Sequence, residues 1–352
     1  MIQEITAEGL GRLTNPVFVD VRSESEFAEA TIPGAVNLPI FSDLERAEIG
    51  TVYKQVSPLA AKDLGLSLAA PKLPTMVKQC RELEGRGPLV FFCWRGGMRS
   101  RAVAGIMDLM GIKTYRLAGG YKAYRQSVVR FWQRDPLPFG VVVIRGNTGT
   151  GKTQLIQSLR LRGRPAIDLE KLANNRGSVF GAVGLGPPPS QKSFEAGLAE
   201  EVRAFEPAKW IVVECESKRI GRVTLPNSLH QGMERGKQIL VFDTVENRVQ
   251  RLVQEYTSFS SAGLELETAL NRLRQRLGNE TVEQLKSWLG AGTYAPFVRL
   301  LLEEYYDPLY GYPNQPDPAY HESISMADPD RALQQVEEFL DKLEDAGGEI
   351  VS

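Results

Sequence analysis

The chain has 352 residues, which is long enough for two domains that each bury a core of their own. Its content of 42% apolar and 24% charged residues is ordinary for a globular protein, and no apolar run approaches the roughly 18 residues of a membrane span. The net charge of −1 hides an uneven distribution, because residues 93–134 carry nine basic side chains against one acid and residues 301–352 carry two against thirteen. A basic middle favours a polyanionic partner such as RNA, and solvated helix faces are the alternative.

The cysteines and histidines exclude several classes of site. Cys80, Cys93 and Cys215 have no C-x-x-C spacing, which argues against a disulfide framework or a zinc site. With only His230 and His321 in the chain, His-based relays and His-rich metal sites are not expected. The first ten residues lack the basic and apolar stretches of a signal peptide. We therefore expect a cytoplasmic protein without a resident metal and without a membrane association.

Strand and helix signals alternate through the first third of the chain. The pattern predicts strands at Val17–Arg22, within Thr31–Pro39, at Leu89–Phe92 and within Lys113–Gly120, and helices at Ser23–Ala30, Arg101–Met110 and Tyr121–Gln133. Two prolines mark the stretch Gln133–Gly140 as a linker. This alternation predicts an α/β domain over residues 1–134.

The segment CWRGGMRS, Cys93 to Ser100, lies where a buried strand gives way to a helix. A Gly-rich turn at this place directs backbone N–H groups toward the cysteine sulfur, and the helix N-terminus and nearby arginines also favour the thiolate. Such a cysteine carries a transferable group or attacks phosphorus. The residues that we expect around the bound anion are Arg95, Gly96, Gly97 and Arg99.

A second α/β unit follows the linker. Strands are predicted at Val141–Ile144, Arg164–Glu170, Trp210–Ser217 and Gln238–Asp243, after which long amphipathic helices follow, interrupted by an aromatic loop at Tyr305–Pro318 and ending in a helix at Arg331–Leu343. We therefore divide this part into a domain at 135–250 and a helical C-terminal extension at 251–352.

The sequence GNTGTGKT matches the phosphate-loop pattern G-x-x-x-x-G-K-[ST] in full, after a buried-type strand and before a helix. Its glycines allow a nest of backbone N–H groups to bind phosphates, its lysine adds charge, and its last threonine can hold Mg²⁺. The predicted diphosphate-binding residues are Gly146, Asn147, Thr148, Gly149, Thr150, Gly151, Lys152 and Thr153.

An acid that holds the metal ion should lie at the end of a neighbouring strand. Asp168, Glu214 and Glu216 are the candidates, and a structural role for each of them stays open. The polar segments Asn174–Gly181 and Pro189–Glu195 are predicted to be loops over this site, with Arg176 and Lys192 as phosphate contacts.

The first domain resembles a rhodanese domain through DVR at residues 20–22, EFAEATIPGAVNLP at 26–39, the Cys93 loop and LAGGYKAYR at 117–125. Together with ERAEIGTVYKQ at 45–55, DLEKLANNRGSVFG at 168–181, PSQKSFE at 189–195 and the phosphate loop, these segments resemble the bacterial tRNA 2-selenouridine synthase family. The implied fold is a rhodanese-like domain followed by a parallel-sheet domain of the P-loop NTPase type with a helical extension.

The resemblance implies a tRNA-modifying transferase acting on the wobble 2-thiouridine, in the anticodon stem-loop, of tRNAs for Lys, Glu and Gln. Sulfur would first be alkylated by geranyl diphosphate, and the S-geranyl group would then be replaced by selenium from selenophosphate. Cys93 matches the family's catalytic cysteine, which carries selenium as an S-selanyl intermediate, and residues 146–153 match its phosphate loop. No tightly bound cofactor is implied, and Mg²⁺ would assist the diphosphate.

Three other interpretations stay open at this point. The C-x5-R spacing from Cys93 to Arg99 is also that of phosphatase loops, which suggests a phosphatase fused to a kinase, although the sequence shows no obvious aspartate for the general acid. A nucleotide-switched RNA-binding module would leave Cys93 incidental. A thiolation enzyme would carry a persulfide on Cys93 and use ATP.

Overall fold

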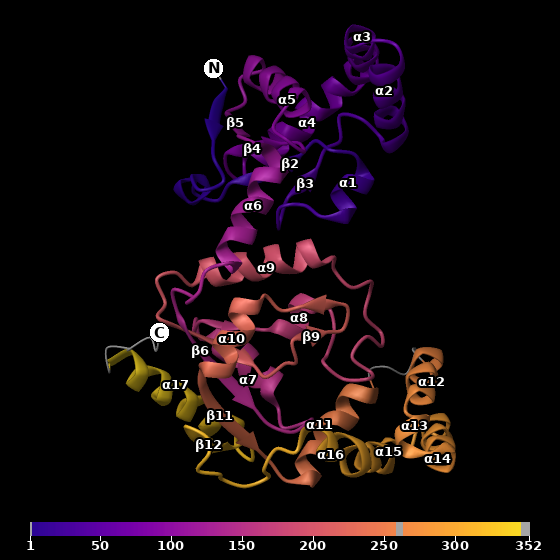
Figure 1. Ribbon diagram of the computed structural model, residues 1–352, viewed down its shortest axis with the longest axis vertical. Coiled ribbons are helices and arrows are strands. Elements are labelled where there is room, and N and C mark those ends of the chain that lie inside the picture. The colour runs from indigo at the N-terminus through magenta and orange to yellow at the C-terminus, as the bar shows by residue number, and fades with distance from the viewer. Residues whose placement is uncertain (1, 258–262, 346–352) are drawn as a thin grey trace. The chain divides into compact units, whose positions relative to one another are not determined.

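The computed structural model describes residues 2–257 and 263–345 of the chain (Figure 1). It consists of two compact units, Met1–Phe131 with Glu195–Gly197, and Trp132–Phe194 with Leu198–Ser352. In the described ranges no helix has the length and apolar character that crossing a membrane requires.

The first unit is built on a parallel sheet with the strand order β1-β5-β4-β2-β3. Its strands are β1 (Gln3–Ile5), β2 (Val17–Asp20), β3 (Val36–Asn37), β4 (Leu89–Phe92) and β5 (Thr114–Leu117). Its helices are α1 (Glu24–Glu29), α2 (Asp43–Gln55), α3 (Pro58–Ala69), α4 (Leu73–Glu84), α5 (Met98–Leu109) and α6 (Gly120–Trp132), with single 3₁₀ turns at Leu10–Arg12 and Ala70–Lys72. The parallel order confirms the α/β fold expected for this part of the chain.

Local sequence accounts for the elements that lead to Cys93. All four residues of β4 are buried, as expected for a strand covered on both faces of a parallel sheet. Helix α1 begins after Ser23, whose hydroxyl and the Glu26 carboxylate form a capping box. Helix α5 begins at Met98, earlier than the predicted Arg101, because Gly97 ends the turn and serves as its N-cap. The cysteine is therefore fixed between a buried strand and a helix start.

The second unit contains a parallel sheet with the strand order β12-β11-β6-β8-β7. These strands are β6 (Gly140–Arg145), β7 (Ala166–Ile167), β8 (Trp210–Glu214), β11 (Lys237–Phe242) and β12 (Glu322–Ser325), and a small antiparallel pair is formed by β9 (Arg219–Ile220) and β10 (Val223–Thr224). Helices α7 (Lys152–Leu161), α8 (Leu169–Ala173), α9 (Gln191–Ala204), α10 (Asn227–Arg235) and α11 (Val245–Thr257) connect them. The phosphate-loop sequence connects β6, the central strand, to α7.

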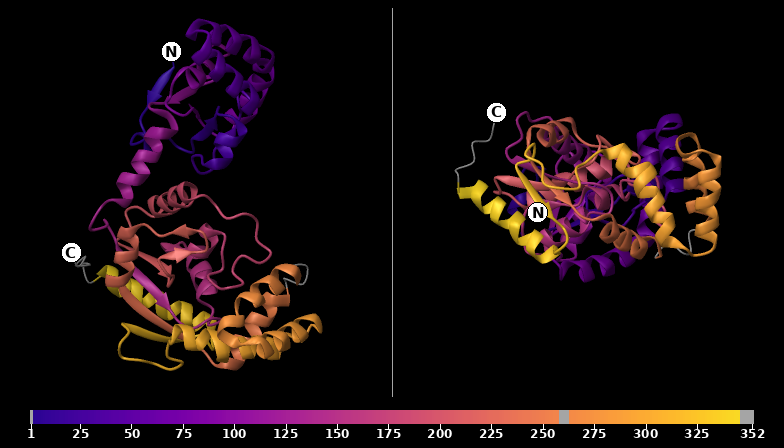
Figure 2. Two further views of the ribbon diagram at one scale, coloured as in Figure 1. Left: turned by 45° about the vertical axis from the view of Figure 1, so that its right-hand side comes forward. Right: turned by 90° about the horizontal axis from the view of Figure 1, so that it is seen from below.

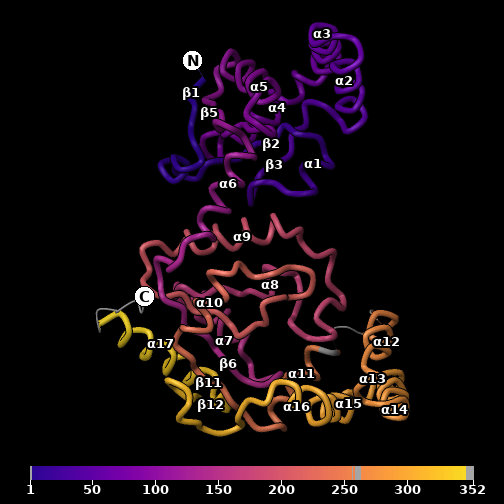
Figure 3. Tube along the Cα trace, viewed as in Figure 1, coloured from indigo at the N-terminus to yellow at the C-terminus, as the bar shows by residue number. Residues whose placement is uncertain are grey.

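The C-terminal region differs from the helical extension that the sequence predicts. Helices α12 (Gly263–Arg272), α13 (Arg274–Leu277), α14 (Asn279–Gly290) and α15 (Tyr294–Leu301) pack around an apolar cluster to one side of the second sheet (Figure 2). The chain then returns as β12, which adds a parallel strand beside β11 before α17 (Pro329–Asp345), a path that can be followed in Figure 3. The sheet strand was missed because ESIS is short and only partly apolar.

Three local predictions are wrong in part. The predicted strand at Arg164–Glu170 is a strand only at Ala166–Ile167, because Asp168 caps α8 through the Lys171 amide. The segment Pro189–Glu195 is a loop only at its start, since Ser190 caps α9. The Tyr305–Pro318 loop begins as the π-helical segment η3 (Leu302–Tyr306) and the short helix α16 (Asp307–Tyr310).

Candidate functional site

The chain contains two glycine-rich turns with the geometry of anion sites, one in each unit. In the first, Cys93 follows β4 directly, and 4% of its surface is exposed. Its sulfur lies 3.3 Å from the Ser100 hydroxyl on the first turn of α5. The first N–H groups of α5 have no intrahelical acceptors, so they are available to an anion beside the sulfur.

Close backbone contacts hold the sulfur turn in shape. The amide of Tyr121 donates to the Cys93 carbonyl at 2.9 Å, and the Lys122 amide donates to the Trp94 carbonyl at 2.9 Å. A methyl group on Gly120, where φ is +60°, would lie 2.2 Å from the Cys93 carbonyl oxygen. The turn between β5 and α6 therefore braces the Cys93 loop at a distance that only glycine permits.

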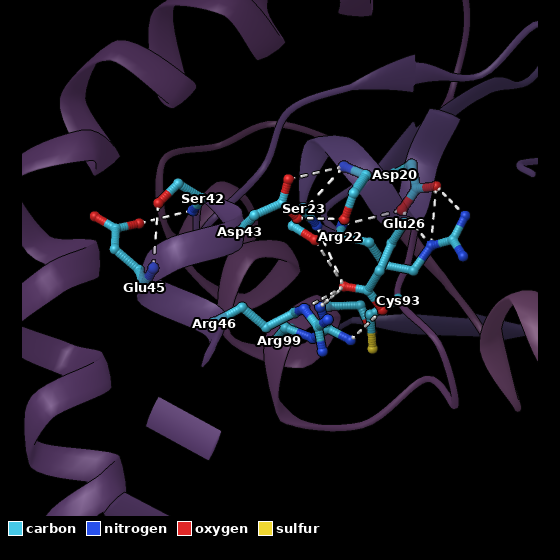
Figure 4. Close-up of polar contacts among 12 residues, drawn as sticks. Asp20, Arg22, Ser23, Glu26, Ser42, Asp43, Glu45, Arg46, Cys93 and Arg99 are labelled. Carbon is cyan, nitrogen blue, oxygen red and sulfur yellow. Dashed lines mark hydrogen bonds and ion pairs between the residues drawn. The ribbon is translucent and has the colours of Figure 1, made fainter. Parts of the chain in front are cut away.

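Arg99, predicted to bind the anion, is paired with an acid that the sequence analysis did not single out. Its guanidinium donates to both carboxylate oxygens of Glu26, at 2.7 and 3.3 Å, and Arg46 lies 3.6 Å from the same carboxylate (Figure 4). Burial would raise the pKa of Glu26, but the hydrogen bonds and charge of Arg99 outweigh it and lower the pKa. The carboxylate thus holds two cations near Cys93.

Asp20 and Arg22 form a buried ion pair in the same unit. Arg22 donates to Asp20 at 2.6 Å, and its guanidinium stands 4.4 Å from the centre of the Tyr121 ring. The pair comes from the DVR motif, and it joins the end of β2 to the start of α6. Of the other predicted residues, Gly96 and Gly97 form the turn, and Arg95 is exposed on it.

The second turn, residues 146–151, connects β6 to α7 and has three glycines with positive φ. At Gly146, a methyl group would lie 2.3 Å from the Val241 carbonyl oxygen, which explains the requirement for glycine. The Lys152 ammonium donates to the carbonyls of Gly146 and Asn147, at 2.8 and 3.2 Å. This is the loop conformation that the GNTGTGKT pattern predicts.

The structure distinguishes between the candidate metal acids. The Thr153 hydroxyl donates to Glu214 at 3.2 Å and to Glu170, which the sequence analysis did not consider, at 3.1 Å. Asp168 instead accepts from the Lys171 amide at 2.8 Å and caps a helix. Glu170 lies in the DLEK segment, but its position near the phosphate loop could be recognised only from the structure, in which Asp168 is the N-cap of α8.

Three carboxylates converge beside Thr153. Burial raises the pKa values of Glu170, Glu214 and Glu216, and the negative charges of the neighbouring carboxylates raise them further. The charge of Lys152 acts in the opposite direction on all three. In the described part of the chain, no set of three or more His, Cys, Asp or Glu side chains is arranged to hold a metal ion by itself. A cation at this place would therefore also need oxygen atoms from a bound molecule such as a diphosphate.

The phosphate loop opens into a cavity of about 1040 Å³. Arg176, a predicted phosphate contact, lines this cavity, whereas Lys192 on the first turn of α9 is not among the lining residues. The Asn147 side chain is directed elsewhere: it is 2% exposed and donates to the Tyr312 carbonyl at 2.8 Å. Only the backbone of Asn147 is therefore left for a phosphate.

The fold and the two turns define an α/β protein that joins a rhodanese-like domain to a phosphate-loop domain. A family model for the rhodanese-like domain matches residues 6–127, and a model described as the tRNA 2-selenouridine synthase AAA domain matches residues 139–342. The chain is 32% identical over 330 residues to the tRNA 2-selenouridine synthase of Pseudomonas syringae pv. syringae, covering 85% of this chain and 89% of that protein. It is 35% identical over 331 residues to the enzyme of the same name from Hydrogenovibrio crunogenus, covering 86% and 90%.

A third relative, the tRNA 2-selenouridine synthase of Psychromonas ingrahamii, is 32% identical over 322 residues, covering 84% of this chain and 87% of that protein. These relatives match both domains in one alignment. The chain belongs to the tRNA 2-selenouridine synthase family.

Proposed function

We propose that this protein is an enzyme of the cytoplasm that converts 2-thiouridine in tRNA to 2-selenouridine by two successive transfers at its two turns. The named activity of its relatives supports the tRNA substrate. The proposed position is the wobble uridine in the anticodon stem-loop of tRNAs for Lys, Glu and Gln. The observation that carries the proposal is that two glycine turns occur on one chain, one that begins at Cys93 and one that has the phosphate-loop conformation.

In the first transfer, the phosphate loop holds the diphosphate of geranyl diphosphate. The thiocarbonyl sulfur of the tRNA base forms a bond to the geranyl carbon, the carbon–oxygen bond breaks, and diphosphate leaves with the electron pair. The base loses its N3 proton to solvent and remains neutral. Lys152 and the loop amides stabilise the charge on the leaving group. Thr153 and Glu214 would hold Mg²⁺, which supplies further neutralisation of the diphosphate.

In the second transfer, selenium from selenophosphate replaces the geranylthio group at C2 of the base. The C2–selenium bond forms and the C2–sulfur bond breaks, so geranylthiol is released. Water cleaves the phosphorus–selenium bond and takes the phosphoryl group, so phosphate is the second product. We assign the handling of selenium to Cys93, with the selenophosphate oxygens at Arg99 and at the amides of the turn formed by Gly96 and Gly97. Arg99 uses two of its N–H groups on the Glu26 carboxylate, and a guanidinium has five, so the others remain for the oxygens of a phosphate group.

The test is a stepwise reconstitution with purified protein and tRNA that contains 2-thiouridine. Geranyl diphosphate and Mg²⁺ alone should give an S-geranyl nucleoside, detected by mass spectrometry after digestion, and later addition of selenophosphate should give 2-selenouridine. No geranyl adduct under these conditions would refute the first transfer. A selenouridine product formed without geranyl diphosphate would refute the proposed order.

The same assay separates the other interpretations. An enzyme that thiolates tRNA through a Cys93 persulfide would require ATP, whereas both proposed transfers proceed without ATP. A phosphatase–kinase fusion would release phosphate from an aryl phosphate. An RNA-binding module without catalysis would leave the nucleosides unchanged and would tolerate replacement of Cys93.

A further inference from the structure

The cavity at the phosphate loop is larger than a diphosphate needs and has an aromatic wall. Its volume of about 1040 Å³ is at the upper end of the roughly 300–1,000 Å³ typical of sites for small organic ligands. Besides the loop and the carboxylates, the lining includes Tyr310, Tyr312, Leu185 and Leu252. Diphosphate can account for the polar part of this lining. The apolar part of the lining would suit an organic group attached to the diphosphate.

Three tyrosine rings form a nearly parallel series at this wall. The Tyr310 ring is inclined by 10° to that of Tyr306 and by 13° to that of Tyr312, with ring centres 6.4 and 6.5 Å apart. Tyr306 is 1% exposed and belongs to the apolar cluster of α11–α15, so it anchors the series in the core. Tyr310 keeps 41% of its surface exposed, in the cavity wall.

The aromatic segment is fastened to the phosphate loop. The Asn147 side chain donates to the Tyr312 carbonyl at 2.8 Å and accepts from the Tyr312 amide at 3.3 Å. The Tyr312 hydroxyl accepts from Arg145 at 3.2 Å and lies 3.1 Å from the Cys215 sulfur. The aromatic rings are therefore held in a fixed position relative to the phosphate site, which is the arrangement that a ligand with two unlike ends requires.

We propose that Tyr310 and Tyr312 bind the hydrocarbon part of an allylic diphosphate whose phosphates occupy residues 146–153. The inference rests on the proposed function and adds the place and the residues that hold the organic group. Ring faces suit an allylic ligand in two ways: they bury its apolar surface, and their negative potential stabilises the positive charge that grows on carbon as the carbon–oxygen bond breaks.

A nucleoside could also stack on a tyrosine, but this wall favours a hydrocarbon. The Tyr312 hydroxyl already contacts Arg145 and Cys215, so this residue offers its ring rather than a hydrogen bond to a sugar or a base. The side chains of Leu185 and Leu252 offer none either. The tyrosine rings and the two leucines add apolar surface to a cavity that also has polar side chains in its lining, which suits a ligand with one charged end and one apolar end.

The test compares the binding of geranyl diphosphate, inorganic diphosphate and ATP to the full-length protein by calorimetry in the presence of Mg²⁺. Tyr310→Ala should weaken binding of geranyl diphosphate about tenfold and leave inorganic diphosphate within about twofold of wild type. Tyr310→Phe retains the ring and should bind like wild type. The matched control is Tyr53→Ala, a tyrosine on α2 that is 57% exposed. Equal losses for both ligands, or no loss with Tyr310→Ala, would overturn the inference.

Cys215 provides a second readout that needs no activity, since it is partly exposed and lines the same cavity. Alkylation of Cys215 by a maleimide, followed on its peptide by mass spectrometry, should slow at least fivefold with saturating geranyl diphosphate and less than twofold with inorganic diphosphate. Wild-type protein that binds neither diphosphate refutes the proposed function itself. Equal affinity for the two diphosphates, or tighter binding of ATP, would still support the phosphate loop as a phosphate site. Either result would refute the binding of a hydrocarbon group by Tyr310 and Tyr312.

Discussion

The two turns that we propose as anion sites have opposite surroundings. At the Cys93 turn, the proposed reactive atom belongs to the protein, and the nearby cations Arg99 and Arg46 share one carboxylate, that of Glu26. At the phosphate loop, the Glu170 and Glu214 carboxylates meet at Thr153, Glu216 lies close to them, and Lys152 is a nearby cation. At the first turn two arginines face one carboxylate, whereas at the second turn each carboxylate lies in the field of another.

This difference agrees with the proposed division, in which Cys93 handles selenium and the phosphate loop only binds its ligand. The arginines and helix amides near Cys93 provide the surroundings that a selenium carrier needs to hold an anion beside its sulfur. A cluster of buried carboxylates is costly until a cation binds, as suits a site that would bind Mg²⁺ together with a diphosphate. Variants that disable one turn and spare the other therefore test the comparison directly.

The largest effect is expected for Cys93→Ser. A serine hydroxyl is too weak an acid to replace the thiolate, so conversion of S-geranyl tRNA to selenouridine should fall at least about a thousandfold. Geranylation of 2-thiouridine tRNA, measured by nucleoside mass spectrometry on the same preparation, should stay within about twofold and serves as the internal control. Selenouridine formed at the wild-type rate would remove Cys93 from the mechanism.

Lys152→Ala is the converse experiment. Loss of the ammonium that faces the phosphate site should lower the rate of geranylation about a hundredfold, while selenation of tRNA that already carries the geranyl group continues. Lys209→Ala, an exposed lysine before β8, is the matched control for a lost positive charge. If Lys152→Ala slows both transfers equally, the two turns do not divide the chemistry as proposed.

The sequence predicted the two turns well because their patterns are local. The stretch from Leu89 to Phe92 and the glycines of residues 146–151 fix a strand end and a loop with little help from the rest of the chain. The partners that complete the sites were missed where they come from distant segments. Glu26 lies 73 positions before Arg99, and Tyr312 lies 165 positions after Asn147.

Contacts with distant segments also explain why the strand β12 was not predicted and why the side chain of Asn147 does not face the phosphate site. β12 is a weak strand by itself and exists because β11 offers a paired edge. Asn147 stands inside a phosphate-binding motif, but its side chain binds the Tyr312 backbone instead of a ligand. Motif spacing shows where a backbone turns, and it does not show where each side chain of the motif is used.

A smaller effect is expected where the sulfur turn is braced. Gly120→Ala places a methyl group 2.2 Å from the Cys93 carbonyl oxygen at a positive φ, so the first unit should lose about 2–4 kcal/mol of unfolding free energy. Thermal unfolding followed by calorimetry should show its transition about 10 °C lower. Gly50→Ala is the matched control, because its methyl group meets nothing within 4 Å. An unchanged transition would mean that the turn is not braced by this contact.

The smallest effect tests the unbalanced charge at the phosphate loop. Burial, with the negative charge of Glu214, raises the pKa of Glu216 to about 7 from a value of 4.5 in the unfolded chain. Between these values the folded form keeps a proton on Glu216 that the unfolded form releases. The contribution of Glu216 to the unfolding free energy therefore falls as pH rises from about 4.5 to 7 and is level above pH 7.

Glu216→Gln removes this dependence. In EDTA and without ligand, the variant should unfold about 3–6 °C above wild type at pH 8 and close to wild type at pH 5, as measured by calorimetry of the second unit. Glu246→Gln replaces an exposed acid on α11 and should show no gain at pH 8. A gain of equal size at both pH values would trace the effect to packing rather than to charge. Such a result would mean that the charge of Glu216 is already neutralised in the ligand-free protein. The difference in charge between the Cys93 turn and the phosphate loop would then not exist.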